Sequence, residues 1–386
     1  NATDANRGKE VFAFAPNEMM QNQKNAFLSE TSSTLGKNNL FYGIDAPWTA
    51  YTQYVAKADG TLTVKDSGRV AQNASGDDIA IKGLQWVYGG LRMGGKSYYA
   101  LNLSDLDNPE LKFHIDPANS KIYKSSSTTT GVTALSYMGQ SWSKPTIAYV
   151  KFGGVKKLVM FVGGGYDPGY ENAAYDQSTT TGGGAGVYMF DANNGDLLWW
   201  TSANATAAGG AEAFTDASAA TINMKYSVVS QINAIDRDSD GLVDNLYFGD
   251  LGGQAFRVDL NNAATGADAS AKKANFAKLV VRLFDEHATG GASPRFYEMP
   301  SVSIHEDNGY VAAVAFSSGN RSSPLVGAVA ASGRNNQAGS TVSAADGVFV
   351  VYDKDVARTD LYTTLPATGA TALQTQSVSL ATLDTT

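Results

Sequence analysis

Short apolar runs, rich in β-branched and aromatic residues, follow one another along most of the chain and end at Gly, Asn or Asp. Runs of this length, bounded by turn-forming residues, are typical of β-strands. The 3.6-residue period of an amphipathic helix is nearly absent, and residues 16–28 form the best helix candidate. The pattern therefore predicts an all-β protein.

A loose repeat joins these runs in pairs: an apolar strand, a glycine cluster, a second apolar strand that often ends in Asp or Asn, and a turn. Four copies lie within residues 85–103, 158–200, 245–260 and 311–353. A ring of such sheets buries faces that one sheet cannot bury alone. We therefore expect a modified, quinoprotein-like β-propeller of about seven blades. A long pair of β-sandwiches is the alternative, but it does not readily explain the recurring second strand.

We expect one domain over residues 1–386. Residues 1–40 are a lead-in segment, 41–355 form the blades, and 356–386 are a tail or closing strand. Long irregular inserts of small polar residues are expected on the rim; they are residues 125–130, 170–184, 203–220 and 331–345.

Large aromatic residues fall into two groups. Four tryptophans in or beside strands are predicted to pack between blades: Trp86, Trp142, Trp199 and Trp200. Three tyrosines in or near a polar insert are predicted to form a contact surface, since tyrosine suits partly wet interfaces: Tyr166, Tyr170 and Tyr175.

Composition excludes several classes of protein. The net charge is −8 and only 17% of residues are charged, so the basic face of a nucleic-acid-binding protein is not expected. The absence of cysteine excludes disulfides, thiolate metal sites and a cysteine nucleophile. No apolar run approaches the ~20 residues that span a bilayer. The chain opens at Asn1 without a start Met or a leader, which leads us to expect a processed or excised piece.

The sharpest chemical signal is an aspartate-rich stretch at residues 236–244. Asp236, Asp238 and Asp240 alternate, Gly241 permits a sharp turn, and Asp244 supplies a further carboxylate. Ca²⁺ takes six to eight oxygen ligands at about 2.3–2.6 Å. We predict a calcium site formed by these four aspartates and the carbonyl of Leu242. Since four carboxylates at close range repel one another, the loop is expected to open or take up protons without a cation.

Three other interpretations of the stretch remain. An EF-hand would place a glutamate at position 12, where this chain has Tyr247 inside a predicted strand. An acidic, solvated turn would explain neither the strict alternation nor Asp244. Mg²⁺ prefers fewer protein ligands and retains water. A shortened calcium loop between two strands is therefore favoured.

Residues 236–260 resemble the C-terminal domain of the type IV pilus biogenesis proteins of the PilY/PilC family. Residues 89–109, 139–148 and 161–166 are similar to the family in the same order, and the resemblance covers roughly residues 40–355. It implies a modified β-propeller at the surface or pilus tip of a Gram-negative bacterium. It also implies that calcium in the 236–244 loop switches between pilus extension and retraction, with roles in twitching motility and adhesion.

The partners implied by the resemblance are pilus components, namely minor or major pilins, with an outer-membrane secretin or a host surface as further candidates. We expect a monomeric domain with no enzymatic activity. The enzyme alternative is a quinoprotein-like dehydrogenase, but no coherent set of pocket residues supports it. A purely structural surface scaffold is the third class. The three histidines, His114, His287 and His305, have no metal-ligand spacing and are not expected to be catalytic.

Overall fold

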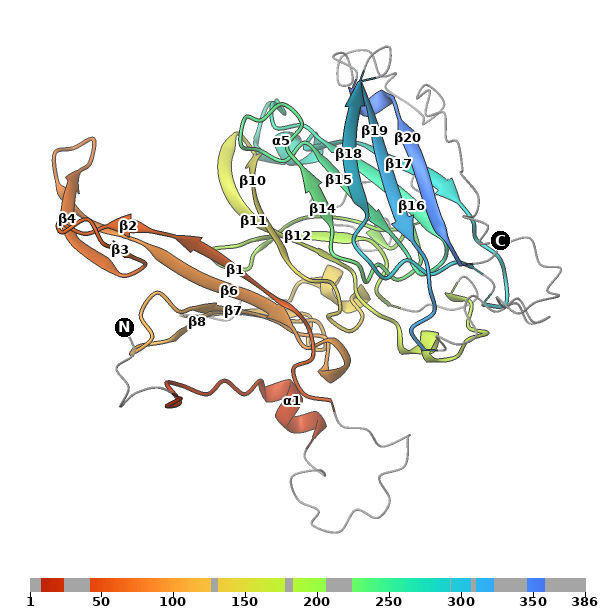
Figure 1. The fold of residues 1–386 in the computed structure, drawn as a ribbon, viewed down its shortest axis with the longest axis horizontal. Helices are drawn as coiled ribbons and strands as arrows, with labels where there is room; N and C mark the ends of the chain where they lie inside the picture. Colours follow the sequence, from red (N-terminus) through yellow and green to blue (C-terminus); the bar gives the residue numbers. More distant parts are fainter. Residues whose placement is uncertain are drawn as a thin grey trace, which may run out of the picture.

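The computed structural model describes residues 8–23, 42–125, 131–177, 183–205, 224–291, 293–306, 310–322 and 346–357. In these ranges the regular secondary structure is mainly β-strand, arranged as four principal antiparallel sheets and two small hairpins (Figure 1). The predicted all-β class is confirmed.

Each principal sheet is formed by strands that follow one another in the sequence, except that the two small hairpins lie between the first two strands of the first sheet. The first sheet has the order β1 (Trp48–Gln53), β6 (Leu84–Gly90), β7 (Tyr98–Asn102), β8 (Glu110–Asp116), β9 (Lys121–Lys124). The second is β10 (Thr146–Phe152), β11 (Val155–Gly163), β12 (Val187–Asp191), β13 (Leu197–Thr201). The third is β14 (Asn233–Ile235), β15 (Asn245–Gly249), β16 (Gln254–Leu260), β17 (Ala277–Asp285). The fourth is β18 (Ser301–Glu306), β19 (Tyr310–Ser317), β20 (Val348–Asp353).

The four copies of the sequence repeat are paired strands within these sheets. They correspond to β6 with β7, β11 with β12, β15 with β16, and β19 with β20, each pair antiparallel. The glycine clusters let neighbouring backbones approach closely; a Cβ atom on Gly163 would lie 2.3 Å from the carbonyl oxygen of Val228. The repeat therefore predicted one strand pair of each principal sheet.

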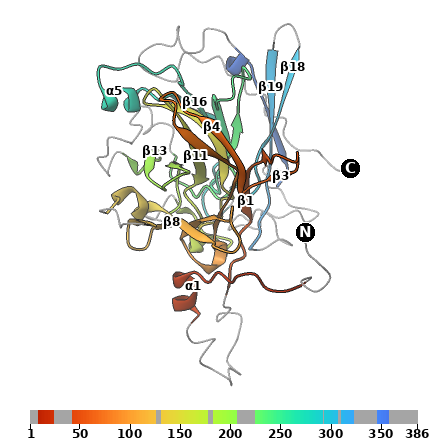
Figure 2. The ribbon, with the colours of Figure 1, turned by 90° about the vertical axis from the view of Figure 1, so that its left-hand side faces the viewer.

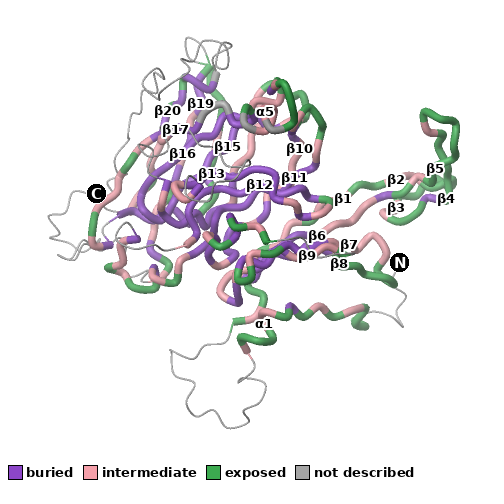
Figure 3. The backbone as a smooth tube through the Cα atoms, turned by 180° about the vertical axis from the view of Figure 1, so that it is seen from behind, coloured by how far each residue is buried: buried purple, intermediate pink, exposed green. Residues whose placement is uncertain are grey.

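Consecutive sheets pack against each other through three clusters of buried side chains. Tyr88 and Phe113 of the first sheet share a cluster with Trp200 of the second. A second cluster joins the second sheet to the third, and a third joins the third sheet to the fourth. Figure 3 shows this buried interior running through the body of the molecule. Face-to-face packing of successive four-stranded sheets is how propeller blades are arranged.

The expectation of about seven blades is not met by the described residues, which contain four blade-like sheets. The repeat itself occurs four times, and the described segments between its copies supply further strands of the same four sheets.

The helices are short. The predicted helix at 16–28 is α1, Asn17–Asn22, which starts directly after Pro16; residues 24–28 lie outside the described part. The carboxylate of Glu18 accepts hydrogen bonds from the backbone N–H groups of Lys96 (2.9 Å) and Ser97 (3.0 Å). This holds α1 beside the first sheet (Figure 2). The other helical segments are η2 (Arg92–Gly94), η3 (Thr133–Tyr137), η4 (Pro168–Glu171), α5 (Ala269–Ala274) and η6 (Asp355–Ala357). No helix in the described ranges is long and apolar enough to cross a membrane.

A feature that the sequence did not predict is an arm between β1 and β6. It contains two hairpins, β2 (Val55–Ala56) with β3 (Leu62–Thr63) and β4 (Asp66–Gln72) with β5 (Asp78–Lys82). The arm extends away from the body (Figures 1 and 3). Tyr54, Leu62 and Val70 on it are each more than 60% exposed.

Of the two predictions for aromatic residues, the one for the tryptophans is confirmed and the one for the tyrosines is wrong. Trp142, Trp199 and Trp200 are buried as expected, and Trp86 packs against the cluster of the first two sheets. The predicted tyrosine contact surface is wrong, because Tyr166 and Tyr170 are 1% and 2% exposed. They pack with Trp142 and Tyr297, and Tyr175 packs against them. The described part of the 170–184 insert thus contributes to the interior; 178–182, and nearly all of the 125–130, 203–220 and 331–345 inserts, lie outside the described residues.

Candidate metal-ion site

The aspartate-rich loop connects β14 to β15 at the outer end of the third sheet. Asp236 follows β14 directly, and Asp244 immediately precedes β15. The N–H of Asp244 donates to the carbonyl of Ile235 (2.8 Å), so the two ends of the loop are held together. Gly241 has a φ of +83°, a conformation that glycine adopts without strain. The predicted turn at this glycine is confirmed.

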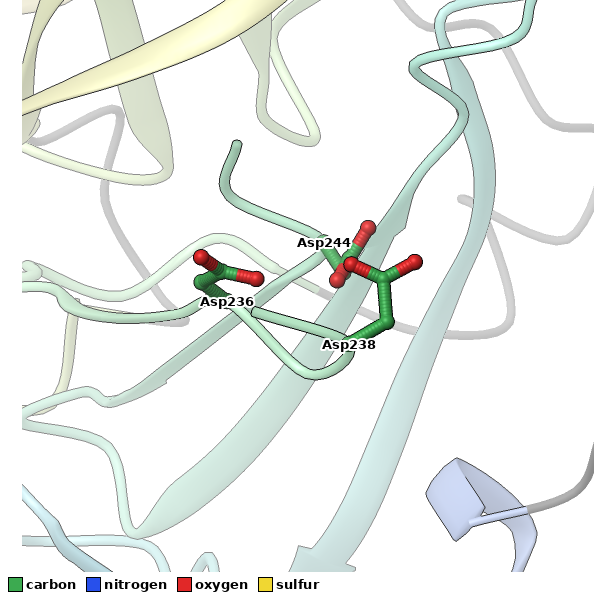
Figure 4. A group of neighbouring side chains, drawn as sticks. All are labelled: Asp236, Asp238 and Asp244. Carbon is green, nitrogen blue, oxygen red and sulfur yellow. The ribbon is translucent and has the colours of Figure 1, made fainter. Parts of the chain in front are cut away.

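Three of the four predicted carboxylates come together. One ligand oxygen from each of Asp236, Asp238 and Asp244 lies within 4.8 Å of the others. Figure 4 shows the three side chains grouped where the loop meets β15. Oxygens at this separation can be shared by one cation with Ca–O distances of about 2.3–2.6 Å. The donor set, consisting only of carboxylate oxygens, fits a hard divalent ion.

The other two predicted ligands, Asp240 and Leu242, contact each other. Asp240 is not in the group of three, and its Oδ1 accepts the backbone N–H of Leu242 (2.8 Å). The backbone N–H of Asp240 lies 3.2 Å from Oδ1 of both Asp236 and Asp238. In this geometry Asp240 shapes the loop that presents the other carboxylates.

Backbone N–H groups offset part of the repulsion among the carboxylates. Gly241 N–H donates to Oδ2 of Asp236, and Arg237 N–H donates to Oδ2 of Asp244, both at 2.8 Å. Charge-assisted hydrogen bonds of this kind stabilise the ionised carboxylate. These donors hold the loop in a closed shape, and their positions could not be read from the sequence.

Asp244 differs from the other two because it is only 7% exposed. Burial raises the pKa of its carboxyl group, the N–H of Arg237 opposes this increase, and the negative charge of Asp238 adds to it. Asp236 and Asp238 are exposed to solvent. The site thus combines one buried carboxylate at its base with two accessible ones.

Several residues that anchor the loop were not identified from the sequence. The side-chain amide of Asn262 donates to the carbonyl of Val243 (2.9 Å) and lies 3.4 Å from Oδ1 of Asp244. The N–H of Val243 donates to the carbonyl of Tyr149 in the second sheet (2.8 Å). Asn262 is distant from the loop in sequence, and a backbone contact carries no residue-type signal, so the sequence alone offered no clue to either.

A buried ionic network lies next to the loop. Arg257 is fully buried, and its guanidinium contacts Asp259 (2.8 and 3.0 Å) and Asp353 of the fourth sheet. Asp259 also accepts a hydrogen bond from Asn245, the residue after Asp244 (2.6 Å). The guanidinium of Arg237 donates to the carbonyl of Val356 (3.1 Å). The loop is therefore connected to β20 through the ionic network and, through Arg237, to η6, which follows β20.

Each of the three histidines contacts a neighbouring side chain. His114 stacks on Tyr99 with ring centroids 4.3 Å apart. His305 lies 2.9 Å from the hydroxyl of Ser303. Nδ1 of His287 lies 3.0 Å from Oγ of Ser293, and Asp176 is 3.8 Å from Nε2.

The hydroxyl of Ser293 makes hydrogen bonds within its own loop. It is buried, donates to the carbonyl of Ala288 and accepts the N–H of that residue, both at 3.0 Å. The Ser293–His287 contact therefore closes a loop.

One of three comparisons with known proteins agrees with the resemblance in the sequence. No protein-family model matches the chain, and no curated protein matches it. A solved structure, the C-terminal domain of PilY1 from Pseudomonas aeruginosa, matches 91% of this chain with a TM-score of 0.50 and 18% sequence identity.

The chain has the fold of the PilY1 C-terminal domain. It spans 54% of that PilY1 chain. The predicted resemblance is confirmed at the level of the fold.

Proposed function

We propose that this chain is a calcium-binding, propeller-type domain of a protein associated with type IV pili. It would act outside the cell, at the cell surface or pilus tip, through binding and not through catalysis. The observation that carries the proposal is the group of three carboxylates within 4.8 Å, in a fold shared with the PilY1 C-terminal domain. On this proposal the sheets continue into a modified β-propeller, and the partners are pilins, a secretin or a host surface.

The residues of the loop have distinct roles in this proposal. Asp236, Asp238 and Asp244 supply the oxygens, while Asp240 keeps the turn closed through Leu242. Bound Ca²⁺ supplies the positive charge that three close carboxylates require. Asn262, Arg237 and Val243 connect the loop to neighbouring sheets. The loop surface offered to a pilus partner would thereby be fixed, which supports extension and opposes retraction.

Calorimetric titration with calcium tests the site. We expect Asp238→Asn and Asp244→Asn to weaken calcium binding about tenfold or more, since each removes a charged ligand. Asp78→Asn, an exposed carboxylate on the arm, is the matched control. Equal affinity in all four proteins would rule out the site.

The structural-scaffold alternative has one observation in its favour. The loop is already closed by its own hydrogen bonds, from Gly241 to Asp236 and from Arg237 to Asp244. Calcium would then add stability without switching anything. Twitching assays on bacteria with folded Asp238→Asn separate the two: normal extension and retraction would support the scaffold, and altered motility would support the switch.

The dehydrogenase alternative is tested by spectroscopy. A quinone absorbance band in the purified protein, together with dye-linked oxidation of a substrate, would replace the binding function with an enzymatic one.

A further inference from the structure

A cavity of about 370 Å³ lies between the third and fourth sheets, beside the aspartate-rich loop. Its walls are the facing sides of the two sheets: Ile235 and Tyr247 on one side, and Val302, Ile304 and Tyr310 on the other. Protein interiors leave few voids larger than a water molecule, whose share of liquid volume is about 30 Å³. The cavity is more than a packing defect, and its size falls within the range of ligand pockets.

The cavity arises from the residues at this end of the two sheets. The same two sheets pack tightly further in, through the cluster that contains Phe296 and Phe316. Toward the loop, the facing positions are taken by Asn245 and by the small side chain of Ala312. Ile304 and Tyr310 remain 57% and 62% exposed, although they line an apolar wall. Exposed apolar side chains around a concave surface are typical of a binding site.

One polar atom in the wall lacks a partner. Asn245 is fully buried and lines the cavity; its amide nitrogen donates to Asp259, but its Oδ1 accepts no hydrogen bond. An unsatisfied buried acceptor costs about 1–3 kcal/mol, so a donor supplied by a ligand would be favoured there. This observation is independent of the acidic loop and calls for an N–H or O–H group on the ligand.

The lining of the cavity contains one basic and one acidic residue, Arg237 and Asp238, and the loop that carries both has a net negative charge. Asp238 lines the cavity and also belongs to the carboxylate group of the loop. Residues 236–244 contain four aspartates and one arginine, Arg237, whose guanidinium already donates to Val356. A cation next to the cavity mouth is therefore favoured by charge complementarity.

We propose that this cavity binds a peptide segment of a partner protein in which an aliphatic side chain stands next to a lysine or arginine. The aliphatic side chain fills the space between Val302, Ile304 and Tyr310. A peptide N–H donates to Asn245, and the cationic side chain lies against Asp238.

Because Asp238 belongs to both sites, calcium and the peptide oppose each other, and the effect is reciprocal. This linkage rests on the proposed calcium site, whereas the peptide site itself does not.

The test uses three acetylated, amidated peptides of the form Gly-Ser-X-Z-Ser-Gly, titrated calorimetrically into the full chain with EGTA present. X-Z is Leu-Lys, Ser-Lys or Leu-Glu. We expect the Leu-Lys peptide to bind at least about tenfold more tightly than the other two, a difference of about 1.4 kcal/mol. Equal binding of all three, or no binding of Leu-Lys at about 1 mM, which corresponds to about −4.1 kcal/mol, would overturn the proposal.

Substitutions at exposed wall positions locate the site without disturbing the core. Ile304→Asp and Tyr310→Ala are expected to weaken Leu-Lys binding about tenfold or more, because each removes apolar contact with the ligand. Val70→Asp on the arm, 61% exposed in the wild type, is the matched control and should bind as the wild type does. If both wall variants fold, as judged by circular dichroism, and bind normally, the peptide site is not this cavity.

Two further results separate this proposal from the calcium proposal. Saturating calcium should weaken Leu-Lys binding about fivefold or more, the lower end of typical coupling between sites. Ile304→Asp should retain its calcium affinity. If the wild type binds no calcium but still binds the Leu-Lys peptide more tightly than the other two, only the metal site is refuted. If the wild-type protein self-associates and Ile304→Asp abolishes that association, the occupant of the cavity is a second copy of the chain. The peptide assignment would then be overturned.

Discussion

The fully buried arginine, Arg257, has its charge balanced by carboxylates from two different sheets. Asp259 belongs to β16, and Asp353 ends β20. A second contact to Asp353 comes from the hydroxyl of Tyr247 (3.2 Å). Removal of one member of a buried ion pair is far more costly than removal of an exposed one, because the remaining charge is left without compensation.

We predict that Arg257→Leu lowers the free energy of unfolding by about 3–5 kcal/mol. Two carboxylates would remain buried without their cation. Urea denaturation followed by circular dichroism measures the change. Lys65→Met, which removes an exposed contact to Asp105, is the control and should leave the midpoint unchanged. A similar midpoint for both variants would contradict this account of the network.

His114 is predicted to make stability depend on pH. It is stacked between Tyr99 and Tyr123, and burial lowers its pKa below the ordinary 6.5, against the opposing charges of Asp116 and Glu18. The unfolded chain therefore binds a proton at this position before the folded chain does. Its contribution to stability is present above pH 6.5 and is lost as the pH falls toward the folded-state pKa.

Thermal melts between about pH 5 and 7 check this prediction, since the window lies just below the unfolded pKa of about 6.5. His114→Phe keeps an aromatic ring in the stack but cannot titrate. We expect the variant to lose less stability than the wild type on acidification through this range. Parallel curves for the two proteins would exclude His114 as the source.

Among the elements, the paired strands of the repeat were predictable from the sequence, and the hairpins of the arm were not. The strand pairs of the four copies follow from alternating apolar runs and glycine clusters, and each lies where the repeat places it. In the arm, β4 and β5 are exposed nearly throughout, so burial imposes no clear apolar pattern on their sequence. An element without a buried face leaves only a weak signal.

The arm is expected to be dispensable for folding. Gln53 and Leu84 pair directly at the root, so a two-residue Asn-Gly turn can replace residues 54–83 and join β1 to β6. We predict a cooperative transition with a melting temperature within roughly 5 °C of the wild type, because the exposed arm contributes little buried surface. Loss of cooperative unfolding in calorimetry would show that the arm supports the body.

At the scale of the whole molecule, the candidate site joins the second, third and fourth sheets. Spacing in the sequence was sufficient to select the loop and three of its carboxylates. It could not predict that Asp240 lies apart, since this depends on which backbone N–H groups each carboxylate meets. Nor could it predict the anchoring by Asn262 or Tyr149, which only the packing of neighbouring sheets brings to the loop.

Calcium is therefore expected to stabilise the whole domain. At a free concentration about 100 times the dissociation constant, binding to the folded state alone adds about 2.7 kcal/mol. Differential scanning calorimetry should show a higher melting temperature with calcium for the wild type and a smaller increase for Asp238→Asn. Magnesium should raise it less, because that ion requires a tighter octahedral geometry. Equal increases in both proteins would point to binding elsewhere.

The way the arm joins the body has a mechanical consequence. Both of its supporting strands, β1 and β6, belong to the first sheet, and β6 is paired with β7 from Trp86–Asn102 to Gly90–Tyr98. A force applied to the tip of the arm pulls on β1 and β6 along the direction of these strands. The backbone hydrogen bonds between β6 and β7 are then loaded in shear and carry the force together. Bonds loaded together resist more than bonds opened singly. Tension applied to the tip is thus carried into the interior of the first sheet instead of peeling its edge.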